Sequence, residues 1–173
     1  MKKEDIIDRL STNHNDFIGF INSLSQKEFE SAIREKWTPG QQLEHIYLGL
    51  RPLTGVLQSI EFLIQKNFGR SNGKSRDYDT VVEEYRALLK TGLKTTERFE
   101  PKTIKFENRD ELAEKLASTV DQLCANIGKL SEQELDDFFI PHPALKNLTI
   151  REMMYFTIYH LEHHYNQVKQ NLK

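Results

Sequence analysis

Cysteine is almost absent from this sequence of 173 residues, in which Cys124 is the one example. A single cysteine excludes an internal disulfide and a metal cage built from thiolates. Cys124 lies near an apolar helical stripe, so we expect a small buried residue rather than a nucleophile. Glycine and proline are also scarce, with 8 and 5 residues. Because all-β domains need many turn residues, this scarcity favours helices.

Neither sign of charge is in large excess, since 24 Lys and Arg stand against 26 Asp and Glu. Nucleic-acid-binding proteins normally carry a basic face, so we expect no nucleic-acid partner. No apolar run reaches the roughly 18 residues of a membrane span, and no apolar segment follows the charged N-terminus. We therefore expect a cytoplasmic protein without a membrane partner. Its length predicts a single domain over residues 1–173.

Apolar residues recur at helical spacing in five stretches of the chain. These stretches span about residues 3–24, 38–66, 79–91, 108–130 and 150–171. Thr38, Asn108 and Thr149 are each followed three residues later by Gln or Glu, which is typical of a capping box. Pro52 interrupts the second stretch and predicts a kink there. Segment 131–147 shows no such period, and we expect it to be irregular.

Four long amphipathic helices and one short helix predict an all-α fold, a four-helix bundle with one extra short helix. The connections between the second and fourth long helices are long. A simple up-down-up-down order of the helices is therefore not implied.

Three of the six histidines lie within five residues on the last predicted helix. His160 and His164 are four residues apart, so their side chains lie on one face, and two imidazoles at that spacing are able to hold one metal ion. His45, about two turns into the second helix, is the natural third ligand. Three neutral imidazoles with open positions are typical of a catalytic rather than a structural site. They suit Zn, Ni, Fe or Cu better than Ca or Mg.

His163 competes with His164 for the role of ligand, because it also shares a helix face with His160. We favour His164 because it lies on the apolar stripe, whereas His163 is turned toward the outer flank. A buried polar group without a partner costs about 1–3 kcal/mol, and a metal ion is one suitable partner. A plain polar helix face is the alternative interpretation of the cluster.

Other polar residues have less specific interpretations. We expect His14 to be solvated or at the edge of the core, and His142, between two prolines, to be structural or at a pocket rim. Gln167 is placed either to reach the second nitrogen of a ligand or as an ordinary polar residue. Glu44 and Glu162 are expected to be solvated surface charges, since neighbours of the ligands on a helix face other directions.

Two further positions bear on the space around the predicted ligands. Gly49 lies four residues after His45 on the same helix face. Its missing side chain would either leave room for a ligand or let two helices approach. Trp37, just before the second helix, is expected to be a packing residue.

Three segments resemble the DinB / YfiT-like superfamily. Segment 36–45, Lys-Trp-Thr-Pro-Gly-Gln-Gln-Leu-Glu-His, is similar to the start of that superfamily's second helix. Segment 160–167, His-Leu-Glu-His-His-Tyr-Asn-Gln, resembles its last-helix motif, His-x-x-x-His-x-x-Gln. Segment 141–143, Pro-His-Pro, resembles its His-Pro loop. The small residue that usually follows this loop is replaced by Leu-Lys-Asn at 145–147.

This resemblance implies a four-helix bundle in up-down-down-up order, often a homodimer. It also implies a divalent metal, commonly Zn or Ni, on His45, His160 and His164. Characterised members are thiol-dependent transferases or isomerases that use bacillithiol, mycothiol or glutathione, and others are described as metal-dependent hydrolases.

Two classes of function follow from these patterns. The first is a metal-dependent enzyme that presents a low-molecular-weight thiol, or a water in a hydrolase, to a small-molecule substrate. The second is a non-enzymatic, stress-related dimeric binding module. Open space beside the third ligand favours the enzyme, whereas a closed tetrahedral site favours a structural role.

Overall fold

In a computed structural model, the described chain consists of residues 1–32, 36–59 and 69–173. Four long helices lie side by side: α1 (Lys3–Ser23), α3 (Pro39–Val56), α6 (Arg109–Gly128) and α8 (Ile150–Asn171). α2 (Gln26–Phe29) follows α1, and α5 (Tyr78–Lys90) packs outside against α8. Two 3-10 turns, η1 (Glu97–Phe99) and η2 (Phe106–Asn108), connect α5 to α6. The all-α prediction is confirmed in its main statement, because the described chain is mostly helical.

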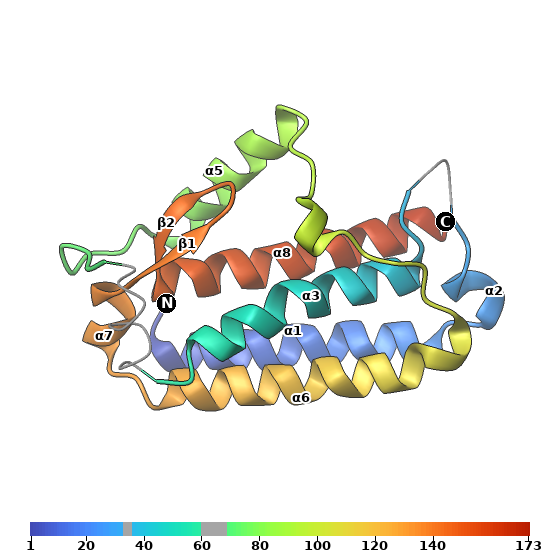
Figure 1. Cartoon of the computed structure of the whole chain (residues 1–173), viewed down its shortest axis with the longest axis horizontal. Helices are drawn as coiled ribbons and strands as arrows, with labels where there is room; N and C mark the ends of the chain where they lie inside the picture. The colour runs from blue at the N-terminus through green and yellow to red at the C-terminus, as the bar shows by residue number, and fades with distance from the viewer. Residues whose placement is uncertain (33–35, 60–68) are drawn as a thin grey trace.

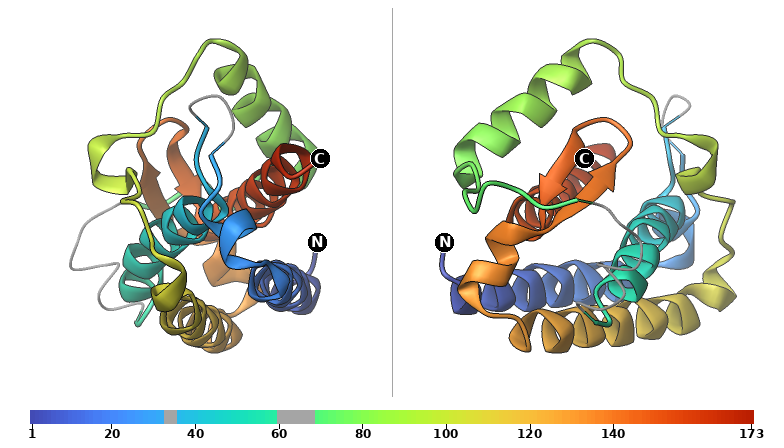
Figure 2. Two further views of the ribbon diagram at one scale, coloured as in Figure 1. Left: turned by 90° about the vertical axis from the view of Figure 1, so that its right-hand side faces the viewer. Right: turned by 60° about the vertical axis from the view of Figure 1, so that its left-hand side comes forward.

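The long helices run in two directions, as the colours along them in Figure 1 show, and the left view of Figure 2 looks along their axes. α1 and α8 run the same way, since the amino end of each lies at the same end of the molecule, where Arg151 donates to the Met1 carbonyl. α3 runs opposite to α8, and α6 runs opposite to α1. This arrangement brings the amino-terminal half of α3 beside the middle and the carboxy-terminal part of α8, which are the segments that carry the predicted ligands.

Apolar stripes from the four long helices meet in one core. The most deeply buried side chains include Phe17 and Ile21 of α1, Leu43 of α3, Leu123 of α6 and Met154 of α8. Each of these residues belongs to the helical period that predicted its element. Burial of such stripes supplies most of the stability of a helical bundle.

Segment 131–147 is not irregular, which corrects our expectation. It contains α7 (Glu132–Asp137) and an antiparallel hairpin of β1 (Phe139–His142) and β2 (Lys146–Thr149). The hairpin places Ile140 opposite Leu148, and both are buried. The two prolines hide the strand pattern, but Pro141 is exposed at the hairpin edge, where proline is tolerated.

α3 ends at Val56, about ten residues before the predicted end. Leu57 leaves the helix although its side chain still packs in the core, so the apolar stripe continues beyond the helix. The predicted positions Ile60 and Ile64 lie outside the described residues. Pro52 lies inside α3, as expected.

The capping predictions hold at two of three positions. Thr38 and Thr149 each accept a hydrogen bond from the backbone three residues later and complete a capping box. α6 begins after Asn108, but the Asn108 side chain makes no capping hydrogen bond because η2 leads directly into the helix. Among the described residues, no helix combines the length and the hydropathy needed to cross a membrane.

Candidate metal centre

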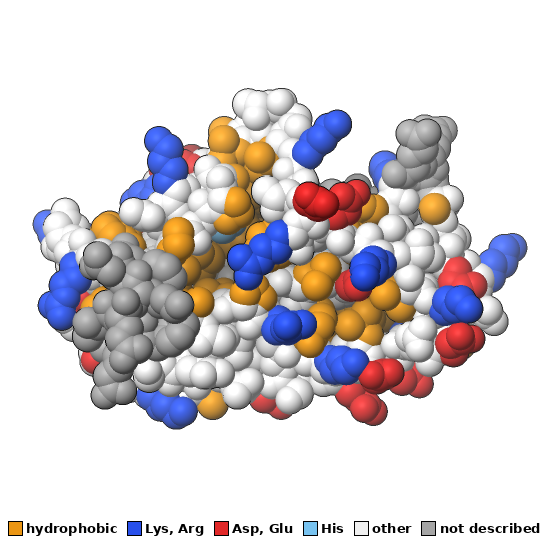
Figure 3. Space-filling model, viewed as in Figure 1, with side chains coloured by type: hydrophobic (Ala, Val, Ile, Leu, Met, Phe, Trp, Pro, Cys, Tyr) orange, Lys and Arg blue, Asp and Glu red, His pale blue; other side chains and the backbone are white. Residues whose placement is uncertain are grey.

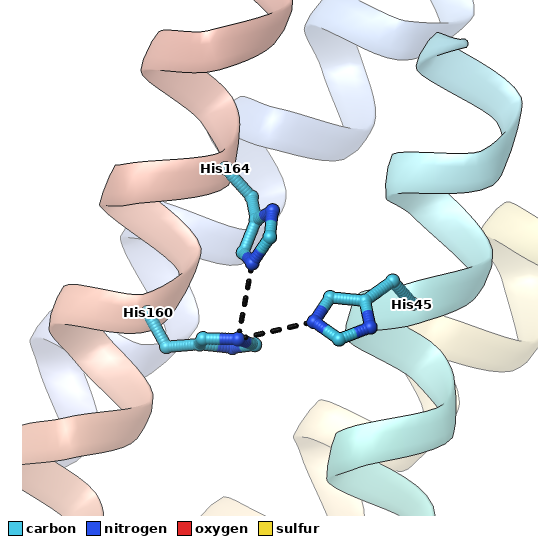
Figure 4. Close-up of side chains that lie close together, drawn as sticks. All are labelled: His45, His160 and His164. Atoms are coloured by element: carbon cyan, nitrogen blue, oxygen red, sulfur yellow. Dashed lines mark hydrogen bonds between the residues drawn. The ribbon is translucent and has the colours of Figure 1, made fainter. Parts of the chain in front are cut away.

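The three predicted ligands meet between α3 and α8 (Figure 4). His45 comes from α3, and His160 and His164 come from successive turns of α8. The Nε2 atom of His160 lies 3.2 Å from Nε2 of His45 and 3.1 Å from Nε2 of His164. One ligand atom from each residue falls within 4.8 Å of the other two.

These separations suit a shared metal ion. Two nitrogens bound at about 2.0–2.1 Å to one tetrahedral ion lie roughly 3.3–3.4 Å apart, close to the spacing found here. Imidazole nitrogens are suitable ligands for zinc or nickel. Calcium and magnesium prefer oxygen ligands, which the three-histidine group does not supply. The donor set therefore fits the divalent ion that the sequence predicts.

The opposite edges of two of the rings are fixed by oxygen acceptors. His45 Nδ1 lies 2.8 Å from the Phe99 carbonyl oxygen, and His164 Nδ1 lies 2.5 Å from Gln42 Oε1. A carbonyl or amide oxygen only accepts, so each Nδ1 carries the hydrogen. The lone pairs of both Nε2 atoms are consequently free and face the centre, which is the tautomer that a metal ligand needs.

Gln167 bonds to Gln42 and His163 and does not contact the second nitrogen of His164, which was one of its two expected roles. Its Oε1 accepts from Gln42 Nε2 at 3.2 Å, and its Nε2 donates to His163 Nε2 at 2.8 Å. Gln42, and not Gln167, therefore contacts the second nitrogen of His164. The chain of bonds also occupies Nε2 of His163, which is outside the three-histidine group.

Burial keeps the three imidazoles uncharged. It lowers the pKa of His45, and it holds the pKa values of His160 and His164 well below the usual range. Electrostatic repulsion between neighbouring histidines, when they are charged, lowers the pKa values of His160 and His164 further. Neutral rings at pH 7 are the form that binds a metal ion.

Aromatic rings enclose the histidines. Trp37 stacks on His164 with 6.1 Å between the ring centroids. Its ring centroid also lies 4.8 Å from that of His45. Phe156 stacks on His160 at 5.0 Å. Trp37 is thus a packing residue, as expected, but it packs on the predicted ligands. These contacts limit the rotation of the imidazole rings.

A cavity of about 610 Å³ opens beside the three histidines. Its wall includes apolar residues of α3, α5, η1 and the hairpin, and Figure 3 shows hydrophobic side chains gathered around a hollow on this face. Gly49 lies in this wall, and a Cβ there would meet no atom within 4 Å. Its missing side chain therefore adds space to the cavity and does not serve a close helix contact.

His14 differs most from expectation, because it is 1% exposed and belongs to the core rather than its edge. His142 is at the cavity wall, as one of our two interpretations held, and its Nδ1 accepts from the backbone of Ala144 and Leu145 in the hairpin turn. Its ring packs edge-on against Phe156 at 4.3 Å. Burial lowers the pKa of both histidines to about 4.

Glu162 and Glu44, which we expected to be solvated surface charges, both have hydrogen-bond partners. Glu162 accepts from Arg9 at 3.0 Å and from Asn13 at 2.8 Å, which ties α8 to α1. Glu44 accepts from the backbone of Lys102 in the connection to α6. Neither glutamate belongs to the three-histidine group, and both form their hydrogen bonds at the surface of the protein.

Gln42, Phe99 and Phe156 contact the three histidines and were not predicted from the sequence. Gln42 lies one helical turn before His45, so it could have been found from its spacing. Phe99 contributes a backbone carbonyl from 54 residues away along the chain, and no local pattern marks such a contact.

The fold is mainly helical, and three histidines converge beside a cavity. The protein is therefore a helical protein whose histidine site is compatible with a metal ion. A model of the DinB superfamily matches residues 9–168, and the chain therefore belongs to that superfamily. Comparison with curated proteins found no match, and comparison with solved structures found none.

Proposed function

We propose that this protein is a metal-dependent enzyme in which His45, His160 and His164 hold one divalent ion, Zn or Ni. Its reaction would be the transfer of a low-molecular-weight thiol to a small electrophile. The observation that carries the proposal is the convergence of three Nε2 atoms beside a cavity of about 610 Å³. Three protein ligands with space beside them are typical of catalytic metal sites.

The chain's own residues prepare the ligands. Phe99 and Gln42 hold the hydrogens on the outer nitrogens, so that the inner lone pairs are free. Burial keeps the rings neutral, and the aromatic contacts fix their orientation. A bound divalent ion would lower the pKa of a thiol or a water at its open position.

An external thiol is needed because the protein offers no suitable one. Cys124, the single cysteine, lies on α6, and its Sγ donates a weak hydrogen bond to the Ile7 carbonyl. Burial raises the pKa of this thiol to about 11, so it remains protonated at pH 7. It is not among the residues that line the cavity.

Metal content tests the site directly. Protein purified without a histidine tag should contain about one divalent ion per chain by elemental analysis. His160→Ala should lose it, because His160 contacts both other ligands. His163→Ala is the matched control from the same helix and should keep it. Loss of the ion in His163→Ala alone would overturn the ligand assignment.

A panel of electrophiles tests the reaction. Metal-loaded protein should accelerate consumption of an electrophile with bacillithiol, mycothiol or glutathione, and His45→Ala should not. Acceleration only without a thiol would replace the transferase proposal by a hydrolase. No metal-dependent acceleration under any condition would favour the dimeric binding module. The homodimer remains a prediction, which sedimentation velocity would test.

A further inference from the structure

His14 has an unused hydrogen-bonding atom in the interior of the bundle. Its Nδ1 lies 2.6 Å from the carbonyl oxygen of Leu10, one turn earlier in α1. Because that oxygen only accepts, Nδ1 carries the hydrogen and Nε2 holds a free lone pair. Among the buried side-chain nitrogens and oxygens of the described residues, His14 Nε2 is the one without a partner.

The place of His14 connects this atom to the cavity. The Nδ1 edge of the ring faces the backbone of α1, and the Nε2 edge is buried in the interior of the bundle. His14 forms part of the wall of the cavity beside the three-histidine group. It is also close enough to influence the pKa of His160.

A role in packing alone does not account for this residue. A buried acceptor without a donor destabilises the fold, whereas an apolar side chain of similar size would avoid that penalty. Burial also holds the pKa of His14 down to about 4, so the ring is neutral and its Nε2 is an acceptor at pH 7. The residue is therefore suited to accept a hydrogen bond from something that enters the cavity.

The rest of the wall restricts the chemistry of that donor. No aspartate or glutamate is among the described residues that line the cavity, while Lys94 and Arg98 are. A cationic ammonium donor would meet two like charges and no counter-charge. Apolar side chains such as Leu53 and Phe156 supply much of the remaining wall. These features favour a neutral donor on a largely apolar molecule.

We propose that His14 Nε2 accepts a hydrogen bond from the uncharged O–H or N–H group of a small, largely apolar ligand in this cavity. The inference rests on the proposed function only in treating the cavity as the ligand site, because the hydrogen bond itself needs no metal ion. His14 would be a binding residue that selects ligands with one neutral donor.

Phenol and toluene form a matched pair of probes, because they have nearly the same shape and only phenol has a donor. Their affinities should be measured by NMR titration for the wild type, His14→Leu and His14→Gln, with and without zinc. Leucine removes the acceptor, and we expect the ratio of phenol to toluene affinity to fall about 3- to 10-fold. Glutamine retains an oxygen acceptor and should preserve part of the preference.

Two further measurements separate this role from packing. His14→Leu should unfold at an equal or higher temperature than the wild type, since it removes an unpaired polar atom. The ¹⁵N resonance of His14 Nε2 should respond to phenol and not to toluene. An unchanged affinity ratio in His14→Leu would overturn the proposal. So would a ¹⁵N resonance of His14 Nε2 that phenol does not move, because the ligand would then make no hydrogen bond to this atom.

The metal proposal fails or stands separately. If the chain binds no zinc but keeps the preference for phenol, the role of His14 stands and the metal-dependent function fails. If zinc binds with normal affinity and the ratio of phenol to toluene affinity does not depend on residue 14, the proposed role of His14 fails and the metal site stands.

Discussion

At the scale of single residues, Gln42 links the three-histidine group to the polar surface of α8. It accepts from His164 and donates to Gln167 in the same network. Gln42→Leu would leave His164 Nδ1 without its acceptor. Partners of this kind typically contribute 10- to 100-fold to metal affinity, and we expect zinc binding to weaken by about that factor.

A competition titration with a chromophoric chelator measures this change. Gln170→Leu is the matched control, because Gln170 is an exposed glutamine of α8, the helix that carries His160 and His164, and it is outside the three-histidine group. Equal zinc affinity in Gln42→Leu and Gln170→Leu would show that the orientation of His164 does not depend on this amide.

Cys124 gives a second prediction at the same scale. Its pKa of about 11 leaves roughly one thiol in a thousand ionised at pH 8. We expect slow alkylation by iodoacetamide in the folded protein and fast alkylation in urea. Cys124→Ser should keep the thiol-dependent activity within about twofold. Loss of that activity would assign the nucleophile to the protein itself.

At the scale of elements, the amino-terminal cap of α3 positions Gln42 and His45. Thr38 accepts from the backbone of Gln41, and the Gln41 side chain accepts from the Thr38 backbone. Thr38→Ala removes the side-chain acceptor and should lower the free energy of unfolding by about 1 kcal/mol. Thr38→Ser keeps the hydroxyl and should remain close to the wild type in urea unfolding. A loss of the same size in both variants would contradict the capping role.

The elements were predictable where local chemistry specifies them. The capping boxes at Thr38 and Thr149, together with the apolar stripes, predict the first residues of α3 and α8 to within about one residue. The end of α3 was not predictable, because Leu57 packs in the core after leaving the helix. The hairpin was missed because four-residue strands that contain proline carry little periodic signal.

At the scale of the whole molecule, the site is only partly encoded in local patterns. The spacing of His160 and His164 and the segment before His45 predict the three residues that the fold brings together. The Phe99 carbonyl and the burial of His14 depend on how distant segments pack, and no short motif contains that information.

The burial of neutral histidines makes the stability of the whole fold depend on pH. In the unfolded chain a histidine titrates near pH 6.5, whereas burial lowers the pKa of His14 and His142 to about 4 in the folded protein. Between these values the unfolded chain binds more protons, so stability is fully present above pH 6.5 and falls as the pH decreases toward 4. Carboxylates ordinarily titrate near pH 4, so the aspartates and glutamates contribute little to this pH dependence of stability above pH 5.

Urea unfolding in the presence of a chelator, at intervals from pH 7 to pH 5, measures this linkage. For a histidine with these two pKa values, the free energy of unfolding should fall by about 1.5 kcal/mol between pH 6.5 and pH 5. His14→Leu should therefore be less sensitive to pH than the wild type by about that amount. Its advantage in stability over the wild type should grow as the pH falls, because leucine has no proton to take up on unfolding. Parallel pH profiles for the two proteins would mean that His14 takes up its proton equally in the folded and unfolded states, which would contradict a pKa lowered by burial.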